Sequence, residues 1–330
     1  MIRVFEAFSG YGSQALGLNR LKETHPEFAY EVVGISEIDR YALQAYKSLH
    51  GHCPNYGDIS KIDWSSVPNF DLFTYSSPCQ DFSSAGKRQG GEEGSGTRSS
   101  LLWECRKAII EKKPRWLLME NVSALVQSKF LTIFNKWQAE LESYGYRNFA
   151  KVLNAKDFGV PQNRERVFLV SVLGDCQFQF PHGAGKDVSL KDILETDVDE
   201  RFYLSDKSIE RVTRDNKGFR GSKLLGEEDI SGTLLASYAK IQRGDTYIKV
   251  GENKLHRKGD YPFRIRRFTP KESFRLMGLQ DGEIDIILSA NISNTQMYHM
   301  AGNSIVVNVL SALFEQMFYP KKIKEINLFY

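Results

Sequence analysis

The sequence lacks the features that mark a membrane protein, a disulfide scaffold or a disordered tail. No apolar run approaches the roughly 20 residues that a membrane-spanning helix needs, and the N-terminus enters a strand-like pattern at once, with no secretory signal. Cysteines number only four in 330 residues, and Cys53, Cys79, Cys105 and Cys176 show neither CxxC nor zinc-type spacing. We therefore expect a cytoplasmic chain with reduced thiols, no metal ion and no membrane contact.

The charge of the chain is nearly balanced in total but not along its length. Lys and Arg number 44 against 41 Asp and Glu, a net charge of +3. Residues 201–267 carry 16 basic and 9 acidic side chains, so this segment holds +7 and the remainder −4. Such a basic segment suits a polyanionic partner, although a solvated basic face would give the same pattern.

The first 175 residues alternate strand-like and helix-like segments, and 41% of the chain is hydrophobic, enough for a sizeable core. Short apolar runs predict strands at residues 3–8, 31–36, 70–75, 116–119 and 167–173. Apolar residues recurring every three or four positions predict helices at residues 14–21, 40–49, 101–111 and 130–144. Alternation with nearly continuous apolar strands is typical of a parallel sheet covered on both faces, so we predict a doubly wound α/β fold.

The pattern changes near residue 183 and again near residue 268. The segment between them is basic and punctuated by glycine, with one short helical period at 204–212, which predicts a smaller, irregular second domain. Helical periodicity returns at 271–277, and residues 305–318 form an apolar helix that can pack back on the first domain. We expect a first domain at 1–183, a second at 184–267, and a returning C-terminal segment at 268–330.

A turn with two glycines follows the first predicted strand. Phe8-Ser9-Gly10-Tyr11-Gly12-Ser13 opens a helix, where the glycines permit a tight turn and let a ligand approach the backbone. Glu37 ends the next strand, 25 residues after Gly12, a spacing comparable to that of the ribose-binding acid in nucleotide folds. A tight turn without a ligand would look the same. Ala15 replaces the third glycine of a dinucleotide motif, which favours a cofactor without phosphates.

Two reactive side chains follow neighbouring predicted strands. Cys79 comes after strand 70–75, at the sheet edge where α/β folds place their ligands, and a glycine-rich loop follows it. It is a candidate nucleophile that a moving loop would cover, whereas a buried structural cysteine is the alternative. Glu120 ends the adjacent strand and would face the same crevice, unless it is a surface acid at a helix start. Arg164 and Arg166, spaced by two, share one side of an extended backbone, as they would in a solvated turn.

These motifs resemble, in order and spacing, those of the DNA (cytosine-5)-methyltransferase family, and the resemblance covers essentially the whole chain. They are FxGxG at 8–12, Glu37, Gly57-Asp58-Ile59, Pro78-Cys79-Gln80, Glu120-Asn121-Val122, Gln162-x-Arg164-x-Arg166 and Gly302-Asn303-Ser304. The nearest likeness is to compact bacterial enzymes of restriction–modification systems.

The resemblance implies a Rossmann-like, S-adenosylmethionine-dependent methyltransferase domain with a smaller target-recognition domain. Cys79 would be the nucleophile, Glu120 would hold the target base at N3, and Arg166, with Arg164 nearby, would contact its O2. The S-adenosylmethionine site would be formed by Phe8, Ser9, Gly10, Tyr11, Gly12, Ser13, Glu37, Ile38, Asp58, Ile59, Ser76, Pro78, Leu101, Asn303, Ser304 and Ile305.

The same resemblance implies methylation at C5 of a cytosine flipped out of double-stranded DNA, through a covalent bond between Cys79 and C6. The DNA-contacting residues would be Gln80, Ser83, Lys87, Arg88, Thr233 and Leu234. Gln242 and Arg243 join them because Gln and Arg can bind purine edges through two hydrogen bonds. We expect a monomer within a restriction–modification system, with a cognate restriction endonuclease as its partner.

Two departures from the family pattern keep alternatives open. Ser76-Ser77 stands where glycine and an aromatic residue or glycine usually precede Pro-Cys, and Ile38 replaces an aromatic residue. The serines partly resemble the tRNA-methylating branch, so a tRNA cytosine-C5 methyltransferase is the alternative, although that branch carries a Cys-Phe-Thr tripeptide that this sequence lacks. A silent DNA-binding regulator is a third hypothesis. The catalytic residues disfavour it, and so does a start at the cofactor motif, which leaves no room for an appended helix-turn-helix.

Overall fold

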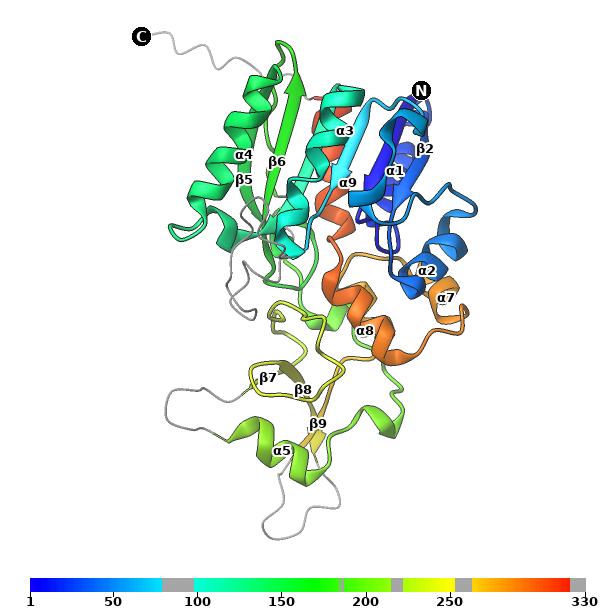
Figure 1. The fold of residues 1–330 in the computed structure, drawn as a ribbon. Helices are drawn as coiled ribbons and strands as arrows, with labels where there is room; N and C mark the ends of the chain where they lie inside the picture. The colour runs from blue at the N-terminus through cyan, green and yellow to red at the C-terminus, as the bar shows by residue number, and fades with distance from the viewer. Residues whose placement is uncertain (79–97, 184, 186, 215–221, 253–262, 321–330) are drawn as a thin grey trace.

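The computed structural model describes residues 1–78, 98–183, 185, 187–214, 222–252 and 263–320. A six-stranded sheet with helices on both faces forms one end of the molecule, and a three-stranded sheet lies toward the other end (Figure 1). Within these residues, no helix is long and apolar enough to cross a membrane.

The large sheet has the strand order β2-β1-β3-β4-β6-β5. Its strands are β1 (Ile2–Ala7), β2 (Tyr30–Ser36), β3 (Leu72–Tyr75), β4 (Trp116–Val122), β5 (Tyr146–Asn154) and β6 (Glu165–Leu173). The first four run parallel, whereas β6 is antiparallel to both β4 and β5. The expectation of a wholly parallel sheet is therefore wrong at this edge, where a short β5–β6 connection makes an antiparallel pair.

Strand β5 was not predicted, and its composition explains why. It is the edge strand, with polar and partly exposed side chains through most of its length, such as Arg147, Asn148 and Lys151. Its buried side chains lie only at its ends, Tyr146 at the start and Leu153 and Asn154 at the end. The strand therefore has no clear apolar alternation, which is the signal that predicts a strand.

Helices cover both faces of the large sheet, which confirms the doubly wound α/β prediction. Successive strand side chains point to opposite faces. Val4, Leu72 and Leu118 pack with α1 (Ser13–Thr24) and α9 (Val307–Phe318) in one core. Phe5, Phe73 and Leu117 pack in the other core, with α3 (Cys105–Lys112) and α4 (Leu131–Ser143). Strands that are apolar on both sides follow from this burial.

The C-terminal segment returns to the first part of the chain, as predicted. After α6 (Pro270–Arg275), α7 (Asp281–Leu288) and α8 (Asn294–Asn303), helix α9 packs along α1. The approach is close, because a Cβ on Gly17 of α1 would lie 2.9 Å from the Leu310 Cβ. Helix α2 (Arg40–His50) contacts α7 on the side that leads to the second sheet.

Residues 184–267 contain regular structure that the sequence did not indicate. Strands β7 (Lys223–Leu225), β8 (Thr246–Glu252) and β9 (Phe263–Arg266) form the smaller sheet beside α5 (Asp206–Thr213). Five side chains form their buried cluster, namely Leu204, Ile209, Val212, Tyr247 and Ile265. Strands β7 and β9 have three and four residues, too few for an alternating pattern, whereas the seven-residue β8 has apolar residues at 247, 248 and 250, which do not alternate strictly. Helix α5 lies where the helical period at 204–212 predicted it.

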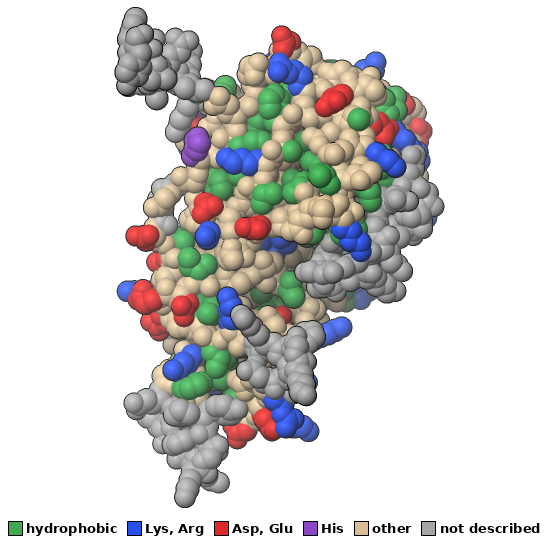
Figure 2. Space-filling view, turned by 90° about the vertical axis from the view of Figure 1, so that its left-hand side faces the viewer, with side chains coloured by type: hydrophobic (Ala, Val, Ile, Leu, Met, Phe, Trp, Pro, Cys, Tyr) green, Lys and Arg blue, Asp and Glu red, His purple; other side chains and the backbone are tan. Residues whose placement is uncertain are grey.

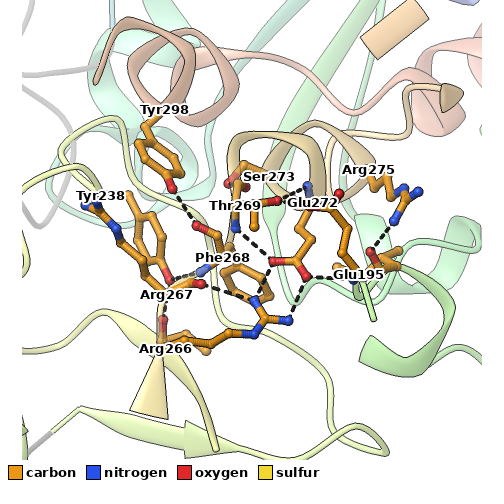
Figure 3. Close-up of polar contacts among 12 residues, drawn as sticks. Glu195, Tyr238, Arg266, Arg267, Phe268, Thr269, Glu272, Ser273, Arg275 and Tyr298 are labelled. Atoms are coloured by element: carbon orange, nitrogen blue, oxygen red, sulfur yellow. Dashed lines mark hydrogen bonds and ion pairs between the residues drawn. The ribbon is translucent and has the colours of Figure 1, made fainter. Parts of the chain in front are cut away.

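A buried ion pair joins β9 to the start of α6 (Figure 3). Arg266 donates to both carboxylate oxygens of Glu272, at 2.7 Å each, and both side chains are almost wholly buried. The same carboxylate accepts from the backbone N–H groups of Glu195 and Thr269. The junction between the smaller sheet and the rest of the chain is therefore fixed by charged hydrogen bonds within the protein.

The face seen from the α4 side carries both signs of charge. Figure 2 shows Lys and Arg interspersed with Asp and Glu over the described residues of this face, with apolar side chains between them. A nucleic-acid surface is expected to be a basic patch or stripe. Over the described residues of this face, the basic side chains are therefore not gathered into one patch.

Candidate active site

A cavity of about 490 Å³ lies at the carboxyl ends of β1, β2, β3 and β4. The strand order reverses at β1, whose neighbours are β2 and β3, and open α/β sheets bind ligands at such a point. The residues lining it include the predicted set Phe8, Ser9, Gly10, Tyr11, Ser13, Glu37, Ile38, Asp58, Ile59, Ser76, Pro78, Leu101, Glu120, Arg164, Arg166, Asn303, Ser304 and Ile305. The volume is that of a small-molecule site.

The turn after β1 has an unusual backbone. Phe8 has a φ of 56°, which is rare for an aromatic residue, and such outliers gather at functional sites. Gly12 has a φ of 86° and is the N-cap of α1, behind the cavity. A Cβ there would lie 2.4 Å from His50 Nε2, so only glycine fits. Burial lowers the pKa of His50 to about 4, and the neutral ring lies 3.1 Å from the Tyr11 carbonyl.

The Glu37 carboxylate is held in one orientation at the end of β2. Its Oε2 accepts from the Gly10 N–H, and its Oε1 accepts from the N–H groups of Ile38 and Asp39, each at 2.8 Å. The glycine turn and the acid are therefore bonded to each other. Ile38 lines the same cavity with a side chain that is 76% exposed, which is unusual for isoleucine and suits a ligand-covered surface.

Asp58 and Ile59 form the next part of the wall. Hydrogen bonds from the Ser60 hydroxyl and N–H lower the pKa of Asp58, which caps the short helix that starts at Ile59. Ile59 is buried among the apolar side chains that also contact Phe8 and Leu101. This part of the cavity combines an ionised acid with an apolar wall.

Glu120 lies two residues before the end of β4, at the opposite part of the cavity, with two donors at its carboxylate. Arg166 Nε lies 3.1 Å from Oε1, and the Ser76 hydroxyl donates to Oε2 at 2.5 Å. The residue is only 6% exposed. The neighbouring Asn121 donates to the Ser77 carbonyl and hydroxyl, which ties the end of β4 to the segment after β3.

Arg164 and Arg166 both line the cavity but bind different groups. Arg166 pairs with Glu120, whereas Arg164 donates to the carbonyls of Leu234, Gly302 and Ser304 at 2.6–3.1 Å. Arg164 lies just before β6, where the backbone is not yet in the ladder, and it turns toward the C-terminal segment. The two arginines thus line the same cavity, but Arg164 donates to backbone carbonyls whereas Arg166 pairs with the Glu120 carboxylate.

The predicted recognition residues Thr233 and Leu234 lie against the segment before β6. Thr233 Oγ1 donates to the Asn163 carbonyl, and the Leu234 N–H donates to Gln162 Oε1. Gln162, which is fully buried, also donates to the Leu276 carbonyl. Gln162 belongs to the motif at 162–166, but its role could not be predicted. No local pattern shows that a glutamine will be buried among backbone groups that are distant in sequence.

Gln242 and Arg243 already have partners within the second sheet region. The Gln242 amide donates to the Ser237 hydroxyl at 2.7 Å, and Arg243 Nε donates to the Arg211 carbonyl at 2.8 Å. Both side chains are partly exposed. The remaining predicted site residues, Cys79, Gln80, Ser83, Lys87 and Arg88, lie outside the described residues.

Comparison with known proteins decides the family. The model of the C-5 cytosine-specific DNA methylase family matches residues 2–319. This chain belongs to that family. The type II methyltransferase M2.ScrFI of Lactococcus lactis subsp. cremoris is 38% identical over 96% of this chain and 99% of its own length. The type II methyltransferase M.NlaX of Neisseria lactamica is 33% identical over 96% of each chain.

Solved structures support the same fold for this cytosine-C5 methylase. The crystal structure of S. pombe Dnmt2 methyltransferase superposes with a TM-score of 0.76 at 20% identity, over 97% of this chain and 99% of the other. A Spodoptera frugiperda DNMT2 mutant gives 0.78 at 21% identity, over 96% and 100%. The predicted family and enzyme class are confirmed, and the silent regulator is not supported.

Proposed function

We propose that this enzyme transfers a methyl group from S-adenosylmethionine to C5 of a cytosine flipped out of a specific duplex DNA sequence. The observation that carries the proposal is one cavity lined at one end by Glu37 and Ile38 and at the other by Glu120 and Arg166. A nucleoside cofactor and a single base, each with its own carboxylate, fit that arrangement.

The residues around the first end fit S-adenosylmethionine. The fixed Glu37 carboxylate keeps one lone-pair direction free, on Oε2, and can accept a hydrogen bond there from a ribose hydroxyl. The exposed Ile38 and half-buried Phe8 offer apolar faces for an adenine. Asp58 would meet the adenine edge. When bound, the sulfonium supplies an electrophilic methyl group to the cavity.

At the other end, the chain itself must activate a carbon that is a poor nucleophile. The Cys79 thiolate would add to C6 while Glu120 makes a hydrogen bond to N3, which gives C5 enamine character and lets it take the methyl group. Loss of the C5 proton and β-elimination then release Cys79. Arg166 would contact O2 of the same base, as a donor already held beside Glu120. Stacking in a duplex hides C6, so the base must be flipped out.

We further propose the division of the chain into a catalytic domain at 1–183, a target-recognition domain at 184–267 and a returning segment at 268–330. The separate sheet β7-β8-β9 and the packing of α9 on α1 support this division. The relatives' names as type II methyltransferases favour a restriction–modification role, with duplex DNA and a cognate endonuclease as partners, over methylation of tRNA.

The proposal is tested with duplex DNA and tRNA as methyl acceptors and with 5-fluorocytosine DNA, which should trap the covalent adduct. The wild-type chain should methylate the duplex and form the adduct, and Cys79→Ser should do neither, because an alcohol is far less ionised than a thiol. Cys53→Ser is the matched control, since burial raises the pKa of Cys53 to about 11 and that thiol should not react. Substantial turnover by Cys79→Ser, or methylation of tRNA alone, would contradict the proposal.

A further inference from the structure

The carboxylate of Glu120 lies between two strand ends that the sheet register places beside it. Strands β3 and β4 pair in parallel with Tyr75 opposite Met119 as the last pair, so Ser76, just past the end of β3, and Glu120 on β4 are the next residues along the two strands. On the other side, β6 is antiparallel to β4 with Arg166 opposite Val122, two residues beyond Glu120. Side chains two residues apart share a face of the sheet, so Arg166 and Glu120 lie on the same face.

The contacts divide the carboxylate evenly between these neighbours. Arg166 Nε pairs with Oε1, and the Ser76 hydroxyl donates to Oε2. Each carboxylate oxygen has about two lone-pair directions, so one donor on each leaves one direction on each for a bound base. Glu120 is almost fully buried, and these two donors fix the plane of its carboxylate.

The hydroxyl of Ser76 differs from the guanidinium of Arg166 in one useful respect. A guanidinium only donates, whereas a hydroxyl donates or accepts by rotating about its C–O bond. Ser76 can therefore stay bonded to Glu120 both before and after the carboxyl group shares a proton with the base. Family resemblance assigns no such contact, since glycine is usual at this position and glycine has no side chain.

We propose that Ser76 is a positioning residue, which orients the Glu120 carboxylate toward the target base and does not itself bind the cofactor. This inference rests on the proposed role of Glu120 in the methyl-transfer reaction. It reassigns Ser76 from the cofactor wall of the cavity, which it lines, to the base-binding end.

Steady-state methylation of duplex DNA by Ser76→Ala, Ser76→Thr and the wild-type enzyme tests the proposal. Ser76→Ala should lower kcat by about tenfold, equivalent to about 1.4 kcal/mol of activation free energy, with KM for S-adenosylmethionine and DNA unchanged. Ser76→Thr, which restores a hydroxyl, should recover most of the rate. Ser171→Ala is the matched control: its hydroxyl is buried on β6 and donates to Asn148, away from the cavity, so kcat should stay at the wild-type value.

Several outcomes would overturn the assignment. A wild-type kcat in Ser76→Ala would contradict the role of Ser76 as a positioning residue. A raised KM for S-adenosylmethionine with an unchanged kcat would also contradict it, because that result would make Ser76 a cofactor ligand. A Thr variant that melts like the wild type but reacts as slowly as the Ala variant would show that the hydroxyl is not the effective group. Glu120→Gln distinguishes the proposed role of Glu120 from that of Ser76. If Glu120→Gln is inactive while Ser76→Ala is fully active, only the Ser76 proposal fails. If Glu120→Gln is fully active, the proposed role of Glu120 fails as well.

Discussion

Replacing Glu272 by Gln is expected to lower the free energy of unfolding by about 3–5 kcal/mol, the usual cost of breaking a buried ion pair from one side. The Glu272 carboxylate has no solvent exposure and accepts four hydrogen bonds, two of them from Arg266. Glutamine has nearly the same side-chain volume as glutamate, but its NH₂ group would face hydrogen-bond donors instead of accepting from them. The charge of Arg266 would then stay buried without a counter-ion.

The same strand offers a matched control. Arg264, also on β9, makes a bidentate contact with Glu200, but that pair lies in solvent, with the Glu200 side chain 75% exposed. In Glu200→Gln the arginine remains hydrated and stacked over the Tyr203 ring, so we expect no measurable change in stability. The two variants remove the same charge from the same kind of pair and differ chiefly in burial.

Urea denaturation of both variants and the wild type, followed by fluorescence, measures the difference. The midpoint for Glu272→Gln should fall well below the other two. Equal midpoints for the two variants, or a loss below about 1 kcal/mol for Glu272→Gln, would refute the reasoning that burial decides the cost. The double variant Arg266→Met with Glu272→Leu should recover part of the loss, because it leaves no unpaired buried charge. The recovery is incomplete because the N–H groups of Glu195 and Thr269 lose their acceptor.

Three other predictions concern the cofactor site, the sheet and DNA contact. Glu37→Ala should raise the dissociation constant for S-adenosylmethionine at least tenfold in calorimetry, since each charged hydrogen bond lost costs about 1.5–3 kcal/mol; unchanged affinity would remove Glu37 as the ribose ligand. Burial raises the pKa of Glu6 from 4.5 to about 8, so the folded state retains a proton that the unfolded state releases, and stability should fall as pH rises from 4.5 to 8. Glu6→Gln should flatten that decline in denaturation at pH 5 and 8, and an equally steep decline would contradict it. Gln242→Ala or Arg243→Ala should relax sequence choice in methylation of a random DNA pool, whereas Lys207→Ala should change only overall, salt-dependent affinity; an unchanged site preference in both would place readout elsewhere in 184–267.

The sequence predicted the elements whose signals are local. Strands β1 to β4 are buried on both faces and therefore read as apolar runs, and the motif residues follow them directly, so their meeting at one sheet edge could be inferred. The helix at 305–318 was predicted for the same reason, since its apolar residues recur with a helical period. Strand β5, polar and at the sheet edge, has no such signal.

What could not be predicted depends on contacts between distant residues. The spacing of Arg164 and Arg166 indicated a shared side, but nothing local shows that Arg164 reaches carbonyls 138 and 140 residues later in the chain. The burial of Gln162 and the contact of Ser76 with Glu120 are of the same kind. In each case, a polar side chain forms a hydrogen bond with a backbone or carboxyl group that is distant in sequence and that only the fold brings near.

These distant contacts make the turn after β1 and residues 233–236 parts of one bonded unit. Ser304 bonds through its hydroxyl to Ser13 and Tyr11 of the first turn, and its carbonyl accepts from Arg164, which also holds Leu234. Gly302 permits this closeness, since a Cβ there would lie 2.3 Å from the backbone nitrogen of Ala236. The cavity thus cannot take its shape from the first 183 residues alone, because the returning segment supplies both its wall and the anchor for residues 233–236.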